Sequence, residues 1–173
     1  SPVQVTLDPK TANAELHLSE DLRCVWWGDR RTDLPSNPER FKFHPCVLGS
    51  RGFISGWHCW EVKIVGQGMW AMGVAKESLL RDQWFHMSPE QGVWALCVGA
   101  EGCKALTSPY PTPLVLYRVL QQIRICLNYG KGEVEFYDAL SQELIFAFRQ
   151  VSFKEETIYP WFRLVGEVHL RLL

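Results

Sequence analysis

Six cysteines are the most reactive side chains in the sequence, and their spacing limits the chemistry open to them. None forms the Cys-x-x-Cys pair that is typical of metal sites and redox motifs, and most lie in apolar stretches, where free cysteine packs as a small hydrophobe. We therefore expect six reduced thiols in or near the core, which favours a cytosolic or nuclear setting. As an alternative, Cys97 and Cys103 could form a bridge across the segment that they flank. The six are Cys24, Cys46, Cys59, Cys97, Cys103 and Cys126.

The histidines do not combine with these thiols into a recognisable catalytic group. His58 precedes Cys59, but neighbouring strand residues point to opposite faces and cannot act as a nucleophile and its base. His86 with Cys97 or Cys103 stays geometrically possible, without a local motif in its support. The sequence also has no phosphate-binding glycine loop, His-x-x-x-His zinc pair or acidic calcium loop. We expect no catalysis, no cofactor and no metal.

Two aromatic clusters in polar surroundings are candidates for contact with a partner. In the first, two residues separate the pair Trp26-Trp27 from the pair Arg30-Arg31, and tryptophan and arginine are enriched at interface hot spots. Strand alternation makes Trp27 the more exposed tryptophan; equally, one tryptophan belongs to the core and the arginines are merely solvated. The second cluster, Trp84-Phe85-His86, forms either a satellite core under a long loop or an interface.

Composition places these residues on one folded domain. The chain has 173 residues, of which 47% are apolar and 21% charged, enough for a continuous core. A net charge of −1 gives no electrostatic argument for binding nucleic acid or an anionic membrane. No apolar run approaches the ~20 residues that cross a bilayer. The chain starts without Met or a signal peptide, and we interpret it as a module cut from a longer protein.

The hydrophobic pattern predicts strands almost everywhere. Apolar and polar residues alternate with period two, interrupted by glycine, proline and asparagine, as in an antiparallel sandwich. A short helical turn is expected after Asp8, which is a competent N-cap followed by proline. Long loops are expected at 26–38, 76–91 and 107–117, and such loops supply binding chemistry at the ends of sheets. The expected strands include residues 60–64, 69–74, 93–98, 123–129, 133–137, 144–148, 158–164 and 168–172.

Several motifs follow one another from about Val5 to the end of the chain. They are Leu7-Asp8-Pro9-Lys10-Thr11-Ala12-Asn13, Glu39-Arg40-Phe41, Phe53-Ile54-Ser55-Gly56-Trp57-His58-Cys59-Trp60-Glu61-Val62, Trp70-Ala71-Met72-Gly73-Val74-Ala75, Gly92-Val93-Trp94, Leu127-Asn128-Tyr129 and Val134-Glu135-Phe136-Tyr137. In this order and spacing they resemble those of the PRY-SPRY domain of tripartite-motif (TRIM) ubiquitin ligases and butyrophilins. The resemblance implies an all-β fold, a bent sandwich of two antiparallel sheets with concanavalin-like jelly-roll architecture. It also implies a single domain over 1–173, with a PRY segment at 1–50 and an SPRY core at 51–173.

In that family, partners dock on a shallow surface made by loops and one exposed sheet face. The positions that match those used by an antibody-binding relative are Glu77, Cys97, Gly99 and Gly166. The relative has an acid and large aromatic residues at these positions, and this chain keeps only the acid, as Glu77. Antibody binding is therefore not expected, and the pocket should be more open than that of the relative. With the residues suggested by composition, the full candidate set for partner binding is Trp27, Arg30, Trp57, Lys76, Glu77, Trp84, Cys97, Gly99, Arg163 and Gly166.

The resemblance implies a cytoplasmic module that recognises a protein or peptide, as the C-terminal substrate-recognition domain of a TRIM-type ubiquitin ligase. Ligase activity would lie in a RING domain outside this chain; the isolated domain would be monomeric, and a coiled coil would dimerise its parent. The alternative is the cytoplasmic sensing domain of a butyrophilin-like receptor that binds a phosphorylated small molecule. That function needs converging cations, whereas Arg51, Lys63, Lys76 and Arg81 are scattered along the chain. Sugar-binding lectins share the architecture, but no acid-plus-asparagine calcium cluster is evident.

Overall fold

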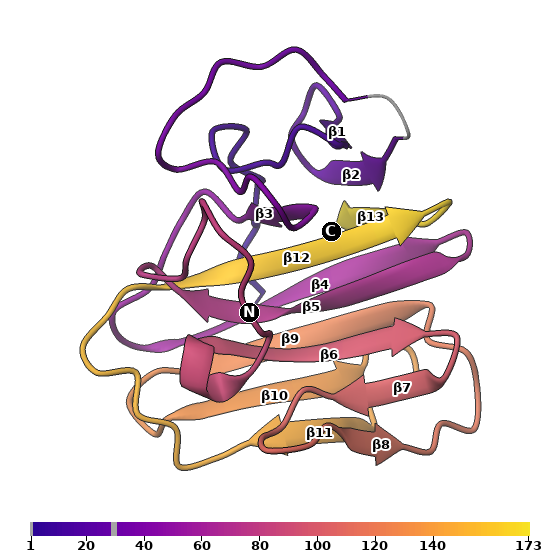
Figure 1. Ribbon diagram of the computed structural model, residues 1–173. Helices are drawn as coiled ribbons and strands as arrows, with labels where there is room; N and C mark the ends of the chain where they lie inside the picture. The colour runs from indigo at the N-terminus through magenta and orange to yellow at the C-terminus, as the bar shows by residue number, and fades with distance from the viewer. Residues whose placement is uncertain (1, 29–30) are drawn as a thin grey trace.

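The chain folds into two antiparallel β-sheets that pack face to face (Figure 1). The computed structural model describes residues 2–28 and 31–173. Sheet I has seven strands in the order β1-β2-β13-β4-β9-β10-β11, and sheet II has six in the order β3-β12-β5-β6-β7-β8. The strands are β1 (Leu16–Leu18), β2 (Cys24–Trp27), β3 (Cys46–Leu48), β4 (Trp57–Val65), β5 (Gly68–Lys76), β6 (Val93–Gly99), β7 (Gly102–Ala105), β8 (Thr112–Leu114), β9 (Gln122–Asn128), β10 (Glu133–Asp138), β11 (Leu144–Phe148), β12 (Ile158–Gly166) and β13 (His169–Leu172).

Alternating apolar side chains build the main core between the sheets. Trp60 is fully buried on β4, and the tryptophans of the facing strands, Trp70 and Trp94, are only 4% and 5% exposed. All three belong to the main core. Each large aromatic side chain buries on the order of 150–250 Å², so these side chains fix which face of each strand points inward.

A second core covers part of the outer face of sheet II. Residues on this face of β5 and β6 are small, among them Ala71, Ala75 and Ala95, and they are almost inaccessible. Phe41 and Phe85, from the segments before β3 and after β5, pack onto them. Because β5 is thereby covered on both faces, its interior reads as an unbroken apolar run instead of an alternating one.

The expected helical turn after Asp8 takes the form of one hydrogen-bonded turn and does not extend into a helix. The Thr11 amide donates to the Asp8 carbonyl at 3.0 Å, and the Asp8 carboxylate accepts from the Lys10 amide at 3.0 Å. The chain leaves helical geometry because the Asn13 amide donates to Cys46 of β3. In the described part of the chain, the assigned helix is a single 3₁₀ turn, η1 (Pro89–Gln91). No described helix is long and apolar enough to cross a membrane.

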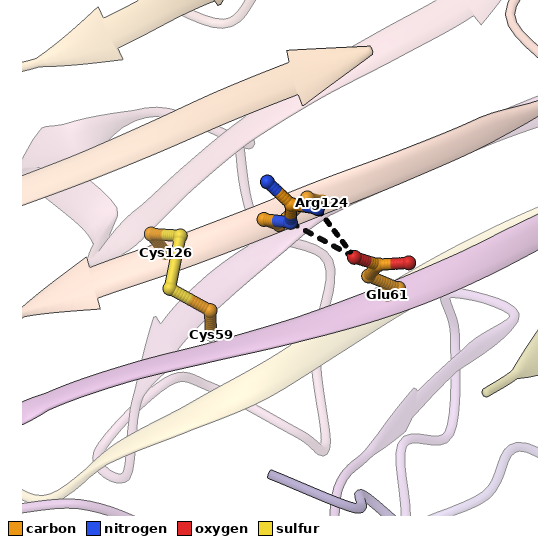
Figure 2. Close-up of a disulfide and its surroundings, with 4 residues drawn as sticks. All are labelled: Cys59, Glu61, Arg124 and Cys126. Atoms are coloured by element: carbon orange, nitrogen blue, oxygen red, sulfur yellow. Dashed lines mark hydrogen bonds and ion pairs between the residues drawn. A yellow bond between two sulfur atoms is a disulfide. The ribbon is translucent and has the colours of Figure 1, made fainter. Parts of the chain in front are cut away.

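The expectation of six reduced thiols is wrong for one pair. Cys59 on β4 and Cys126 on β9 form a disulfide across the outer face of sheet I (Figure 2). The two residues are direct partners in the strand register, with their Cα atoms 4.1 Å apart. The next outward-facing pair is Glu61 and Arg124, which form an ion pair at 2.8 Å.

The alternative bridge between Cys97 and Cys103 is also wrong. Cys103 packs in the core between the sheets, whereas Cys97 packs against the cluster on the outer face of sheet II. The two thiols therefore lie on opposite sides of one sheet, and both are free, as are Cys24 and Cys46.

Candidate functional site

The uncovered part of the outer face of sheet II forms the candidate site, which we call the outer-face patch. It lies next to the part of this face that Phe41 and Phe85 cover. Strand residues supply its floor and a loop supplies one wall. The outer-face patch consists of His44, Met69, Trp84, Cys97, Lys104 and Arg163.

Strand register brings the floor residues together from four strands. Ala71 of β5 lies directly opposite Arg163 of β12 on one side and Cys97 of β6 on the other. Lys104 of β7 is in turn the partner of Cys97. Directly opposed residues of antiparallel strands share a face with Cβ atoms about 4.5–5.5 Å apart, so these side chains form one continuous surface. Met69, one pleat further along β5, is 52% exposed.

A buried histidine anchors the wall of the patch. His44 is only 4% exposed, and its Nε2 lies 3.0 Å from the carbonyl oxygen of Phe85. The ring centroid of His44 lies 4.3 Å from that of Phe85 and 5.6 Å from that of Trp84. Phe85 is buried while Trp84 is 65% exposed. Of the two interpretations of this cluster, the satellite core applies to Phe85, and Trp84 is left facing solvent.

Arg163 dominates the electrostatics of the patch. It is half-buried, its Nε is inaccessible and has no hydrogen-bond partner, and none of the ion pairs among the described residues includes it. Burial and then the Arg163 charge lower the pKa of His44 below its usual value. Burial raises the pKa of the Cys97 thiol, although Lys104 and Arg163 oppose this. At neutral pH the patch therefore presents a cation beside a neutral imidazole and a protonated thiol, which is a poor nucleophile.

The structure brings together about half of the residues expected to bind a partner. Trp84, Cys97 and Arg163 belong to the outer-face patch. Gly99 borders it, because a Cβ at this position would lie 3.6 Å from the Met69 side chain. Gly166 ends β12 at the same end of the sheet, opposite Gly68.

The other expected residues lie elsewhere. Lys76 and Glu77 are at the far end of β5, where Lys76 pairs with Glu156 at 3.9 Å. Trp57 is 61% exposed at the start of β4 in sheet I. Arg30 lies outside the described residues.

Both tryptophans of the pair are half-buried, and the alternation from which Trp27 was expected to be the more exposed one assigned their faces in reverse. Trp27 shares the inward face of β2 with Val25, packs against the main core and donates its indole N–H to Glu15 at 3.0 Å. Trp26 is on the outer face, stacked between His17 and His169 with ring centroids 5.9 and 5.4 Å away. The alternation was expected in the wrong phase, because the start of the strand could not be located from the sequence.

Sequence reasoning missed His44, Met69 and Lys104. Met69 and Lys104 could have been found from alternation, since Met69 has the same parity as Ala71 on β5 and Lys104 follows a buried cysteine. His44 carries no such signal, because its segment has no regular pattern. Among the described residues, no group of three or more histidines, cysteines and acids is placed to hold a metal ion.

These features define a class: an antiparallel β-sandwich in which part of one outer sheet face is left open. The comparisons then name the family. The model of the PRY "SPRY-associated domain" matches residues 5–53, and the model of the SPRY domain matches residues 57–172. The chain belongs to the PRY-SPRY family, and as an SPRY domain it is a non-catalytic interaction module.

Relatives of the chain are larger proteins. It is 44% identical to human zinc finger protein RFP over 87% of the chain, and 40% identical to bovine (Bos taurus) butyrophilin subfamily 1 member A1 over 87%. It is 42% identical to the human E3 ubiquitin-protein ligase TRIM58 over 86%. The chain spans only 28–31% of the length of these relatives.

Solved structures agree on the fold. The structure of stonustoxin matches 99% of the chain with a TM-score of 0.86 and 25% identity, and the match spans 29% of the stonustoxin chain. The PSpry domain of TRIM65 matches 99% of the chain with a TM-score of 0.84 at 22% identity, and the match spans 90% of that domain's chain. The prediction of a two-sheet all-β sandwich is confirmed.

Proposed function

We propose that this domain binds a protein or peptide partner through the outer-face patch. The observation that carries the proposal is an exposed tryptophan and an exposed methionine, Trp84 and Met69, beside an unpaired cation on an otherwise covered sheet face. Aromatic residues, methionine and arginine are the types enriched at protein interfaces. The anchoring of Trp84 by His44 lowers the entropy lost when a partner binds, which favours affinity.

The parent protein is proposed to be a TRIM-type ubiquitin ligase, in which this domain would select the substrate. The support is the similarity to the ligase TRIM58. In that setting the domain would work in the cytoplasm, and a coiled coil of the parent would dimerise it. The disulfide between Cys59 and Cys126 does not favour the cytoplasm, because structural disulfides are rare there.

The alternative, a sensor for a phosphorylated small molecule, has less support. Arg163 is the unpaired cation of the patch, and its neighbour Lys104 is already paired with Glu101 at 2.5 Å. Lys76 is paired at the far end of β5, and Lys63 lies on sheet I. A titration with inorganic pyrophosphate by calorimetry separates the two functions: saturable binding below millimolar concentration would favour the sensor.

Selection from a peptide library tests the proposed site. Peptides with free C-termini are displayed on phage and selected against the domain, and their affinities are then measured for variants. We expect Trp84→Ala and Met69→Glu to weaken binding at least tenfold. The matched control is Trp57→Ala, which removes a similarly exposed tryptophan from sheet I and should leave binding unchanged. Peptides that require Trp57 and tolerate both patch variants would place the site on sheet I instead.

A further inference from the structure

The charge of Arg163 gives information about the partner beyond the existence of a docking surface. A guanidinium is ionised at all relevant pH values and carries N–H donors in a fixed fork. In this protein the fork is half-buried on the floor of the outer-face patch, and its Nε is occluded without an acceptor. An orphaned buried donor on a charged group costs folding free energy.

No acid among the described residues compensates this charge. The ion pairs of the described residues leave Arg163 out. Of the neighbouring strand residues, Ala71 and Cys46 lie directly opposite Arg163 and neither carries a negative charge. The floor strands β5, β6, β7 and β12 carry no acid, and Glu101, in the turn between β6 and β7, pairs with Lys104. His44 and Cys97 respond to the positive charge of Arg163, and no carboxylate is among the causes of their pKa shifts.

We propose that the patch selects a partner that places a carboxylate on Arg163 next to an apolar side chain packed on Trp84 and Met69. This inference rests on the proposed function and names the chemistry of its partner. A carboxylate accepts two parallel hydrogen bonds from a guanidinium, which is the strongest pairing that a protein segment offers it. The carboxylate comes from an aspartate or glutamate side chain or from the free C-terminus of the partner. The apolar neighbour excludes water and strengthens the pairing.

The peptides selected above provide the test. Each carboxylate is neutralised in turn, by Glu→Gln or Asp→Asn substitution or by amidation of the C-terminus, and affinity is measured for the wild type and for Arg163→Gln. We expect one carboxylate whose neutralisation weakens wild-type binding at least tenfold and binding to Arg163→Gln less than threefold. Arg149→Gln is the matched control, because it removes a half-exposed arginine, already paired with Glu133 and Glu135, from sheet I.

Two further measurements keep the result interpretable. Arg163→Gln should unfold at the same or a higher denaturant concentration than the wild type, because the substitution removes an uncompensated charge. The preference for the carboxylate over its neutral form should shrink between 50 and 500 mM salt in the wild type, which requires no variant.

The outcomes separate this inference from the proposed function. Peptides that need Trp84 but lose nothing when every carboxylate is neutralised would overturn the carboxylate preference and leave the docking site standing. Peptides whose affinity is unchanged by both Trp84→Ala and Met69→Glu would overturn the proposed function and this inference with it. A selection that yields no binder would do the same. A preference for acids that survives in Arg163→Gln would assign it to another cation and overturn the inference alone.

Discussion

At the scale of single residues, two glycines of sheet II differ in what they allow. A Cβ built on Gly73 of β5 would lie 2.0 Å from the carbonyl oxygen of Trp94 on the neighbouring strand. A Cβ on Gly99 of β6 would meet only the flexible Met69 side chain, at 3.6 Å. Gly73 is therefore required by a close approach of two backbones, while Gly99 is not required by the fold.

Substitution at these two positions should have opposite results. Gly73→Ala pushes β5 and β6 apart, and we expect a loss of about 3 kcal/mol of unfolding free energy or failure to fold. Gly99→Ala should change unfolding free energy by less than about 0.5 kcal/mol. Urea denaturation measures both. Equal stability of the two alanine variants would contradict the proximity of Trp94 to Gly73.

His44 should make stability depend on pH in the acid range. Burial, followed by the charge of Arg163, lowers the pKa of His44 in the folded protein below the usual value of about 6.5. The unfolded chain then binds more protons than the folded one just below pH 6.5, so the His44 contribution is fully favourable above that pH and is lost as pH falls toward the folded pKa. We expect the urea midpoint to drop more steeply between pH 7 and pH 5 in the wild type than in His44→Gln. The pH dependence of the midpoint is compared, and not the midpoint itself, because His44→Gln also loses the contact with Phe85. Equal pH dependence in the two proteins would contradict the lowered pKa of His44.

At the scale of secondary-structure elements, the disulfide joins two strands that are distant in the sequence. Cys59 and Cys126 are 67 residues apart, and β4 and β9 become neighbours only when sheet I assembles. The strands β9 and β10 of one hairpin could be predicted from the sequence, because their turn and their alternation are local. The pairing of β4 with β9 could not be predicted in this way, because the register between distant strands depends on packing of the whole core. This explains why the thiols were expected to stay reduced.

Reduction of this disulfide should destabilise the domain. Closing a loop of 67 residues restricts the unfolded chain, and removing such a link costs about 2–4 kcal/mol. We expect dithiothreitol to lower the urea midpoint of the wild type and to leave a Cys59→Ala/Cys126→Ala variant unchanged.

Alkylation of the unfolded protein followed by mass spectrometry checks the premise. Without reductant, four cysteines should react, and all six should react after reduction. Six reactive thiols without reductant would contradict the disulfide.

At the scale of the whole molecule, alternation and motifs sufficed to predict the two-sheet sandwich, but not the candidate site. Trp84, Cys97 and Arg163 were expected to contact a partner and lie together in the outer-face patch, yet they were grouped with Trp57 and Glu77, which lie elsewhere. The grouping depends on how residues 77–91 fold back over sheet II, where Phe85 is buried and Trp84 is exposed. Loop conformation follows from such packing and not from a local period.

The methionines offer the most direct test of the outer-face patch as the docking surface. The chain has three, Met69 in the patch, Met72 fully buried in the main core and Met87 beside the second core. In a sample labelled with ¹³C at the methionine methyl groups, Met69→Leu assigns the patch signal. When a selected peptide is titrated in, we predict a saturable shift of the Met69 signal and almost none of the Met72 signal. A Met69 signal that stays in place while the peptide binds would contradict the account.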